Sequence, residues 1–283
     1  MSFTFGQNWL QFSELLDESR VEAAQASLLR LVGEGELPGR SFLDIGAGSG
    51  LFSIAAARLG ATAVMAIDRD EQCLTAAQQN VRLFLNAEQA SVVEIRRGDI
   101  LSLEGFPSSG ADVVYAWGSL HHTGAMWRAI ENAARLCRTD GCLVLAIYNR
   151  TALSPFWLAA KRVYSAAPGP IESAMAAMLC APRVMVRAVR GAHPFRTDRG
   201  MSVWYDAVDW LGGLPYECAK AEELTAFVER LGFSLVRNTL TRRSGCNEFT
   251  FRRRPMPLTS TTPSARSPNG RDLELSDTAP RRS

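Results

Sequence analysis

A glycine-rich turn stands between the first apolar strand and the helix that follows it, and this turn constrains the fold more than any other feature. Residues 42–51 read FLDIGAGSGL, so a strand runs directly into three glycines, each separated by one residue. Glycine permits a sharp turn and a close approach of a ligand to the backbone, while the start of a helix offers unpaired N–H groups. The segment therefore predicts a ligand site at the edge of an α/β sheet.

The spacing of these glycines separates the ligands that such a turn can bind. A dinucleotide fingerprint, G-x-G-x-x-G, requires glycine at position 51, where Leu51 stands, and a phosphate loop requires G-K-[ST], which is absent. The chain has instead an acidic residue two positions before the first glycine, in the pattern Asp44-x-Gly46-x-Gly48-x-Gly50. These spacings count against a nicotinamide cofactor and against a P-loop nucleotide.

Short apolar runs alternate with longer runs of helical period from residue 41 to residue 251, which is typical of a parallel sheet flanked by helices. The predicted strands are residues 41–45, 63–67, 91–96, 112–117, 142–148, 234–238 and 248–252. The predicted helices are residues 50–59, 71–85, 125–136 and 221–231. We expect an α/β fold with a Rossmann-like, doubly wound, seven-stranded sheet, a helical N-terminal extension and a helical lid insertion before the last helix.

Five segments follow from this alternation. Residues 1–40 form the helical extension, residues 41–150 the ligand-binding core, and residues 221–253 the last part of the sheet. Residues 151–220 are too long for a plain connection, which favours a helical lid over extra packing at the sheet edge. Residues 254–283 contain many Pro, Ser and Thr residues and few large apolar ones, so we expect a disordered tail.

Charge and composition exclude several classes of function. The 283 residues include 31 basic and 29 acidic side chains, and the small excess lies in the tail, so no nucleic-acid partner is expected. The longest uncharged apolar stretch in the insertion, residues 173–182, is far shorter than the roughly 20 residues that a membrane span needs. The first residues of the chain show no export signal. We expect a cytoplasmic protein without stable membrane insertion, although residues 183–190, which are apolar and carry arginines, leave peripheral membrane contact open.

The six cysteines form no C-x-x-C pair. Zinc binding and a disulfide framework are therefore not expected, and no metal site is predicted.

Several motifs resemble those of the class I S-adenosylmethionine-dependent methyltransferases, whose first motif reads [DE]-x-G-x-G-x-G. Asp68 ends the second strand 22 residues after Gly46, where the family places a carboxylate that accepts both ribose hydroxyl protons. Residues 97–100 read RGDI, and the resemblance implies that Asp99 and the backbone of Ile100 bind the adenine. Read without the resemblance, Asp99 is a turn residue and Asp112 caps the start of a strand.

The resemblance covers nearly the whole chain before the tail. Residues 203–206, 209–217 and 245–249 are similar to a bacterial subgroup of small-molecule methyltransferases related to quinone-pathway O-methyltransferases. It implies S-adenosyl-L-methionine as the cofactor, held by ten residues. These are Asp44, Gly46, Ala47, Gly48, Gly50, Asp68, Arg69, Asp99, Ile100 and Trp117.

Two adjacent histidines are the candidate catalytic residues. His121 and His122 follow the fourth strand, where open α/β sheets bind their ligands, and a neutral imidazole can take a proton from a phenol or hydroxyl. The alternative is structural: one histidine packs on the cofactor or caps the helix that starts near Gly124, and the other is solvated. His193 lies in the insertion and is expected at the surface.

Four polar residues are expected to wall the acceptor pocket. Tyr148 and Asn149 end the fifth strand, and Tyr205 and Tyr216 lie at the close of the lid. The alternative is that such residues anchor the lid or bond backbone turns.

These features predict methyl transfer to a small-molecule acceptor, with O-methylation of a phenol, quinol or related metabolite expected first. N- or C-methylation of a small metabolite and methylation of RNA or protein are the alternatives. Residues 117–120 read WGSL in place of the [DNS]-P-P-[YFW] motif of amino-group methylases. A non-catalytic cofactor-binding scaffold is the remaining alternative, and a homodimer is left open.

Overall fold

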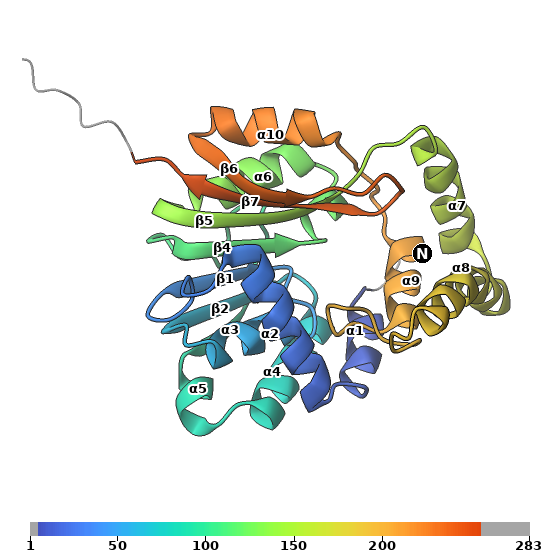
Figure 1. The fold of residues 1–283 in the computed structure, drawn as a ribbon, viewed down its shortest axis with the longest axis horizontal. Helices are drawn as coiled ribbons and strands as arrows, with labels where there is room; N and C mark the ends of the chain where they lie inside the picture. Colours follow the sequence, from blue (N-terminus) through green and yellow to red (C-terminus); the bar gives the residue numbers. More distant parts are fainter. Residues whose placement is uncertain (1–4, 256–283) are drawn as a thin grey trace, which may run out of the picture.

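Seven strands form one sheet at the centre of the computed structural model, which describes residues 5–255 (Figure 1). The strands are β1 (Ser41–Ile45), β2 (Ala63–Asp68), β3 (Val93–Arg97), β4 (Ala111–Trp117), β5 (Cys137–Tyr148), β6 (Phe233–Thr239) and β7 (Cys246–Arg253). They lie in the order β3-β2-β1-β4-β5-β7-β6. The predicted seven-stranded, Rossmann-like α/β fold is confirmed.

The sheet is mixed, because one strand runs against the others. β1 to β5 pair in parallel, whereas β7 is antiparallel to both β5 and β6. The expectation of a parallel sheet is therefore wrong at β7. β6 and β7 follow each other with only a short connection between them, and such a connection permits antiparallel pairing alone.

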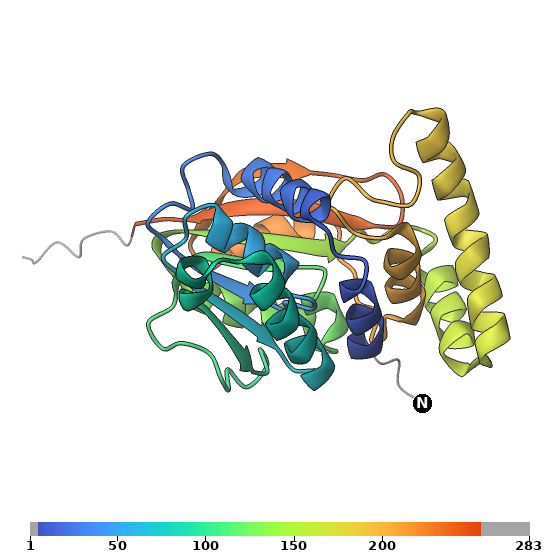
Figure 2. The same cartoon turned by 90° about the horizontal axis from the view of Figure 1, so that it is seen from below.

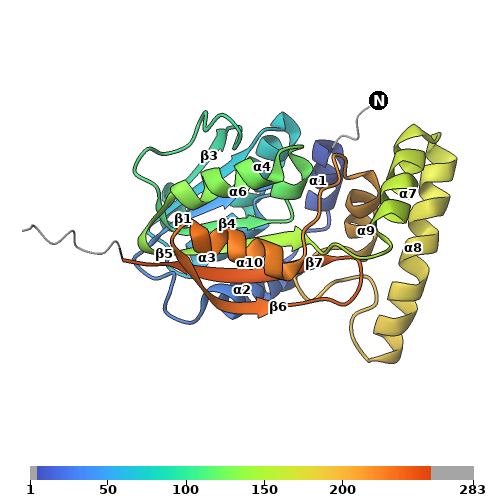
Figure 3. The same cartoon turned by 90° about the horizontal axis from the view of Figure 1, so that it is seen from above.

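Helices cover both faces of the sheet (Figures 1 and 3). One face carries α6 (Met126–Arg135) and α10 (Ala221–Arg230), and the other carries α2 (Glu18–Val32), α3 (Leu51–Arg58) and α4 (Glu71–Phe84). Successive strand residues point to opposite faces, so the central strands are buried on both sides. Their continuous apolar sequence follows from that burial and made them recognisable.

Neighbouring residues of one strand show this alternation. Leu43 belongs to the apolar cluster beneath α6 and α10, whereas Phe42 belongs to the cluster beneath α2 and α3. Val114 and Val113 alternate in the same way on β4. All four side chains are at most 1% exposed, so both layers are closed to water.

Two predicted strand starts need correction. Residues 87–91 form the short helix α5 (Ala87–Ser91), because Asn86 caps it with a reciprocal bond to Gln89, and β3 begins only at Val93. β5 begins at Cys137, five residues before the predicted start, with Asp140 in a left-handed conformation on the way.

The remaining helices gather at the end of the sheet where the glycine turn lies (Figures 1 and 2). They are α1 (Phe5–Ser13), α7 (Ser154–Ala166), α8 (Gly169–Val189) and α9 (Val203–Gly212), and a short turn of helix, η1 (Leu120–His122), follows β4. α1 packs against α4 and α9, and α8 packs along α7 and α9. The predicted tail, residues 254–283, lies outside the described residues except at Arg254 and Pro255.

Among residues 5–255, no helix has both the length and the apolar character needed to cross a bilayer. No group of three or more His, Cys, Asp or Glu side chains in the same range is placed to hold a metal ion. The six cysteines have free thiols, and four of them are buried.

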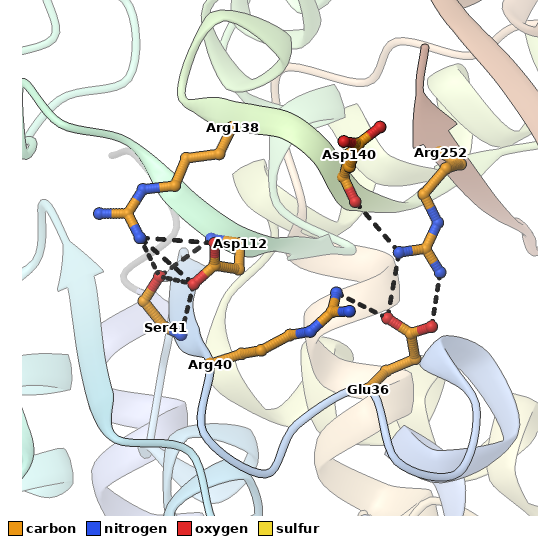
Figure 4. A network of polar contacts seen from close by, with 7 residues as sticks. All are labelled: Glu36, Arg40, Ser41, Asp112, Arg138, Asp140 and Arg252. Atoms are coloured by element: carbon orange, nitrogen blue, oxygen red, sulfur yellow. Dashed lines mark hydrogen bonds and ion pairs between the residues drawn. The ribbon is translucent and has the colours of Figure 1, made fainter. Parts of the chain in front are cut away.

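A polar network ties the amino ends of β1, β4 and β5 together on the side away from the glycine turn (Figure 4). The Asp112 carboxylate accepts hydrogen bonds from the Ser41 backbone N–H (2.9 Å) and hydroxyl (2.6 Å) and pairs with Arg138 at 3.2 Å. Beside it, Glu36 pairs with Arg252 at 2.7 Å. Asp112 thus has the structural role of joining two strands.

We expect Asp112→Ala to lower the free energy of unfolding at pH 7 by about 2 kcal/mol, because Ser41 loses its partner. Burial raises the Asp112 pKa, but the Ser41 hydrogen bonds and the Arg138 charge outweigh it and hold that pKa below its usual value. The contribution is therefore present above about pH 4 and lost below it. Urea unfolding at pH 7 and pH 3 measures this, with exposed Glu131→Ala as a control expected to change stability by less than about 0.5 kcal/mol.

Candidate active site

A cavity of about 930 Å³ opens at the carboxyl ends of the parallel strands. Its wall combines the glycine turn after β1, the end of β2, the loop after β3, η1, and residues of α8, α9 and the loop between them. Open α/β sheets bind their ligands in this position. The volume lies at the upper end of the range for small-molecule sites.

Backbone hydrogen bonds and close packing fix the glycine turn. The N–H groups of Gly46 and Ala47 both donate to the Ile67 carbonyl, at 2.8 and 3.1 Å. Gly46 has φ +77°, and a Cβ there would lie 2.4 Å from the Ser119 Cβ. Only glycine fits at this point, which explains why the motif begins where it does.

An aromatic residue of the N-terminal helix covers the turn. A Cβ on Gly48 would lie 2.9 Å from the ring of Trp9, and Trp9 lines the cavity. The helix is held there because the Gly6 N–H donates to the Asp70 carboxylate at 3.1 Å. The N-terminal extension therefore contributes to the site itself.

Asp68 presents its carboxylate at the end of β2. One oxygen accepts the Gly48 N–H at 3.0 Å, and the other accepts the Asp70 N–H at 3.0 Å. Burial raises the Asp68 pKa, although these two N–H groups act against it. Each oxygen has a second lone pair, so the carboxylate can also accept two hydroxyl protons.

The loop after β3 forms another part of the cavity wall. The Asp99 carboxylate accepts the Leu101 N–H at 2.9 Å, and the Ile100 carbonyl accepts from the Asn132 side chain at 2.7 Å. Asp99, Ile100 and Phe106 line the cavity together. Asp99 is thus both a turn residue and a cavity residue.

The residues present fit S-adenosylmethionine. Carboxyl side chains at the strand ends, among them Asp44, Asp68 and Asp99, line the cavity, and they suit a nucleoside with a cationic end better than a pyrophosphate. Arg69 and Trp117 line it as well. Gly48 and Gly50 are absent from the wall, because Trp9 covers Gly48 and Gly50 packs against Ala77 of α4.

Asp44 is the most deeply buried acid of the turn. Its carboxylate accepts the Ser53 hydroxyl at 2.7 Å, and burial raises its pKa to about 7. The nearby Asp68 adds to that rise, while the Ser53 hydrogen bond opposes it. A cationic group bound beside Asp44 would favour its charged form.

We expect Asp44→Asn to gain stability relative to the wild type by about 2–3 kcal/mol as pH rises from 5 to 8. A carboxyl whose folded pKa is raised stabilises the fold below its unfolded pKa, near 4, and loses this contribution as pH rises through 7. Thermal or urea unfolding of both proteins at pH 5, 6, 7 and 8 measures the difference. Parallel stability curves would contradict the assignment of a raised pKa to Asp44.

The two predicted histidines lie next to each other in the cavity wall. Their rings lie 4.4 Å apart, and the His121 ring lies 3.9 Å from that of Tyr148. The His122 Nδ1 lies 2.9 Å from the Pro215 carbonyl, which can only accept, so Nδ1 carries the proton and Nε2 the lone pair. Burial, followed by the charge of Lys161, lowers the His122 pKa to about 3, and burial also lowers the His121 pKa well below 6.5.

A buried lysine of α7 stands behind this wall. The Lys161 ammonium lies 5.2 Å from the ring centre of Tyr148, 4.7 Å from that of Trp210 and 5.0 Å from that of Tyr216, and it donates to the Trp210 carbonyl. Burial lowers its pKa to about 7. This cation–π cage holds the aromatic wall in place.

Only one of the four residues expected to wall the acceptor pocket lines the cavity, namely Tyr148. Asn149 bonds the Thr241 carbonyl at 2.9 Å and borders a separate hollow. Tyr205 packs on Phe12, and Tyr216 packs behind Tyr148. These three anchor neighbouring elements, which is the alternative that the sequence left open.

Other lining residues were not predicted. Arg183 of α8, Arg199 of the following loop and Asp209 of α9 also line the cavity. Asp209 lies in the segment 209–217 and Arg183 in the segment 183–190, both of which the sequence singled out for other reasons, whereas no motif marked Arg199.

Comparison with known families decides the class of the core. Residues 43–145 match the family described as "Methyltransferase domain". These residues form a methyltransferase domain. The matched segment contains the glycine turn, Asp68 and Asp99, and so the resemblance to class I S-adenosylmethionine-dependent methyltransferases is confirmed for the domain.

Solved structures share the fold over most of this chain, including segments outside residues 43–145. Magnesium protoporphyrin IX methyltransferase from Synechocystis PCC 6803, crystallised with SAH, is 20% identical and covers 89% of both chains with a TM-score of 0.51. An S-adenosylmethionine-dependent methyltransferase from Mesorhizobium loti is 17% identical, with 82% of this chain and 98% of that chain covered and a TM-score of 0.51. At these identities the likeness establishes the fold.

Curated relatives match shorter stretches. A ribosomal protein L11 methyltransferase from Heliobacterium modesticaldum is 52% identical over 60 residues, 21% of this chain and 18% of the relative. An uncharacterised chloroplastic methyltransferase from Arabidopsis thaliana is 29% identical over 124 residues, 44% of this chain and 35% of the relative. The chain spans about a fifth of the length of the first such relatives.

Proposed function

We propose that the methyltransferase domain uses S-adenosylmethionine to methylate a small-molecule acceptor, with an oxygen of a phenol, quinol or related metabolite as the target. The observation that carries the proposal is the single cavity that joins the cofactor residues Asp68 and Asp99 to His121, His122 and the insertion. The cofactor supplies an electrophilic methyl group and a neutral leaving group. The protein must then align the acceptor, exclude water and receive a proton.

The protein residues divide these tasks among them. Asp68 holds the ribose and Asp99 with Ile100 the adenine, while the backbone of the glycine turn and Asp44 hold the amino-acid end. Helices α1, α8 and α9 line the cavity together with the strand ends, and we assign them the task of excluding water. His121 and His122 border the cavity, and burial keeps both imidazoles neutral, so each has a ring nitrogen that can accept a proton. The same burial lowers their pKa values and so makes them weaker bases than an exposed histidine.

The alternatives remain distinct from this proposal. The short stretch of likeness to ribosomal protein L11 methyltransferases makes a protein acceptor one of them, and methylation of tRNA or rRNA, or of a nitrogen or carbon atom of a small metabolite, is another. A cofactor-binding scaffold without turnover is the third. A cytoplasmic location, peripheral membrane contact and a homodimer are further proposals.

The test is to incubate the full chain with cell extract and S-adenosylmethionine labelled on the methyl group. The extract is then separated into small molecules, protein and RNA, and S-adenosylhomocysteine release is measured in parallel. We expect label in the small-molecule fraction, and none in a matched reaction with Asp68→Ala. Label only in protein or RNA would overturn the small-molecule acceptor, and binding without any release would favour the scaffold.

We expect Ala in place of the histidine that acts as base to lower turnover about 100-fold or more, with the cofactor Kd changed less than about twofold. The reason is that the base contacts the acceptor hydroxyl and not the cofactor. His121→Ala and His122→Ala are compared with His193→Ala, because His193 is exposed and lies outside the cavity wall. Wild-type rates in both test variants would eliminate a histidine base.

A further inference from the structure

Two arginines of the insertion border the acceptor side of the cavity with buried nitrogen atoms that have no hydrogen-bond partner. These atoms are Arg183 Nη1 and Arg199 Nε. Among residues 5–255, neither guanidinium has a carboxylate within 4.0 Å. A buried guanidinium nitrogen without a hydrogen-bond partner is costly, so its position at a ligand cavity points to a partner that arrives with the ligand.

Aromatic rings fix the position of Arg199. Its guanidinium carbon lies 3.0 Å from the ring centre of Trp117 and 4.9 Å from that of Phe52, and its Nη2 lies 3.5 Å from the Tyr115 hydroxyl. Trp117 is itself held by a hydrogen bond from its Nε1 to Glu248 at 2.9 Å. The guanidinium is therefore preorganised, and little side-chain entropy would be lost on binding an anion.

The neighbouring acids do not cancel these two charges. Burial raises the Asp206 pKa, although the charges of Arg183 and Arg199 oppose that rise. Burial likewise raises the Asp209 pKa far above its usual value, and Asp209 accepts a hydrogen bond from Asn8 at 2.8 Å. Against Asp206 alone the two guanidinium groups keep an excess of one positive charge, and Asp44, whose carboxyl also interacts with the Arg199 charge, has a pKa raised to about 7.

Both arginines belong to the insertion, with Arg183 on α8 and Arg199 on the loop before α9. Arg199 stacks on Trp117 and its charge acts on the Asp44 carboxyl, so it also lies near the part of the cavity assigned to the amino-acid end of the cofactor. We propose that Arg183 and Arg199 form an anion-binding subsite and that the acceptor carries a carboxylate or a comparable oxyanion. This inference rests on the proposed function, because it names the class of molecule that the same cavity would methylate.

The test uses 4-fluorobenzoate and its neutral analogue 4-fluorobenzamide as probes, because they differ in charge and are small enough to enter the cavity. Fluorine NMR titration follows their binding to the full chain saturated with S-adenosylhomocysteine. We expect the acid to bind at least about tenfold more tightly than the amide. In Arg183→Gln and Arg199→Gln the preference should fall at least about threefold, and in Arg190→Gln, an exposed residue at the end of α8, it should be unchanged.

Equal binding of acid and amide, no binding of the acid, or an unchanged preference in both test variants would overturn the subsite. A second comparison excludes the cofactor's own carboxylate as the partner. If Arg199→Gln weakens S-adenosylhomocysteine but not 5′-methylthioadenosine, which lacks the amino-acid end, Arg199 binds the cofactor and the inference is wrong. Failure of the wild-type chain to bind S-adenosylhomocysteine would instead sink the proposed function, while the probe titration without cofactor still tests the arginines.

Discussion

Asp68→Ala is expected to weaken S-adenosylhomocysteine binding at least about 100-fold, as measured by calorimetry at pH 7.5. The carboxylate would accept two ribose hydroxyl protons, and each charge-assisted hydrogen bond contributes about 1.5–3 kcal/mol. The same carboxylate accepts the Gly48 and Asp70 N–H groups. The substitution therefore removes a ligand contact and also loosens the turn.

A comparison of two ligands separates these two effects. Adenosine has both ribose hydroxyls and 2′,3′-dideoxyadenosine has neither, so the wild type should prefer adenosine by about tenfold or more. If Asp68 binds the ribose, the preference should disappear in Asp68→Ala, whereas a loss that acts only through the turn would weaken both ligands equally. Normal S-adenosylhomocysteine binding by Asp68→Ala would show that the ribose assignment is wrong.

The part of the fold that the sequence predicts correctly is the part in which local pattern and tertiary packing agree. β1, β2 and β4 are buried on both faces, so their apolar runs are continuous, and Gly, Asp and Asn residues mark the starts of the helices between them. The antiparallel direction of β7 could not be inferred in this way, because an apolar strand has the same pattern in either direction. The length of the connection after β6 was the usable signal.

The residues of the candidate site likewise fall into a group that local pattern predicts and a group that only tertiary packing places. Asp44, Asp68 and Asp99 could be predicted because each lies in or just after the last residues of a strand, and the sheet brings the strand ends together. Trp9, Arg183 and Arg199 reach the same cavity from helices and loops far away in the sequence, where tertiary packing alone sets their position. Tyr205 and Tyr216 have the right chemistry and the right segment, yet packing turns them towards Phe12 and Tyr148.

The second large effect is expected at the first glycine of the turn. Gly46→Ala should lower the free energy of unfolding by about 3 kcal/mol or more and abolish measurable cofactor binding. Part of the cost is conformational, because φ +77° disfavours any residue with a Cβ by about 1–2 kcal/mol. The rest is steric, since the new Cβ would lie 2.4 Å from the Ser119 Cβ, and Ser119 is held by a hydrogen bond to the Ile45 carbonyl at 2.7 Å.

Gly39 offers a matched control for the conformational part. It also has φ +77°, but nothing lies within 4 Å of the position that its Cβ would take. Gly39→Ala should therefore cost only the backbone term, and the excess of Gly46→Ala over Gly39→Ala measures the contact with Ser119. Adding Ser119→Gly to Gly46→Ala should recover much of that excess, because the overlapping atoms are gone. Equal costs at the two glycines would show that the turn has room for a side chain, and then the close packing of β1 against η1 would not be what shapes the cofactor site.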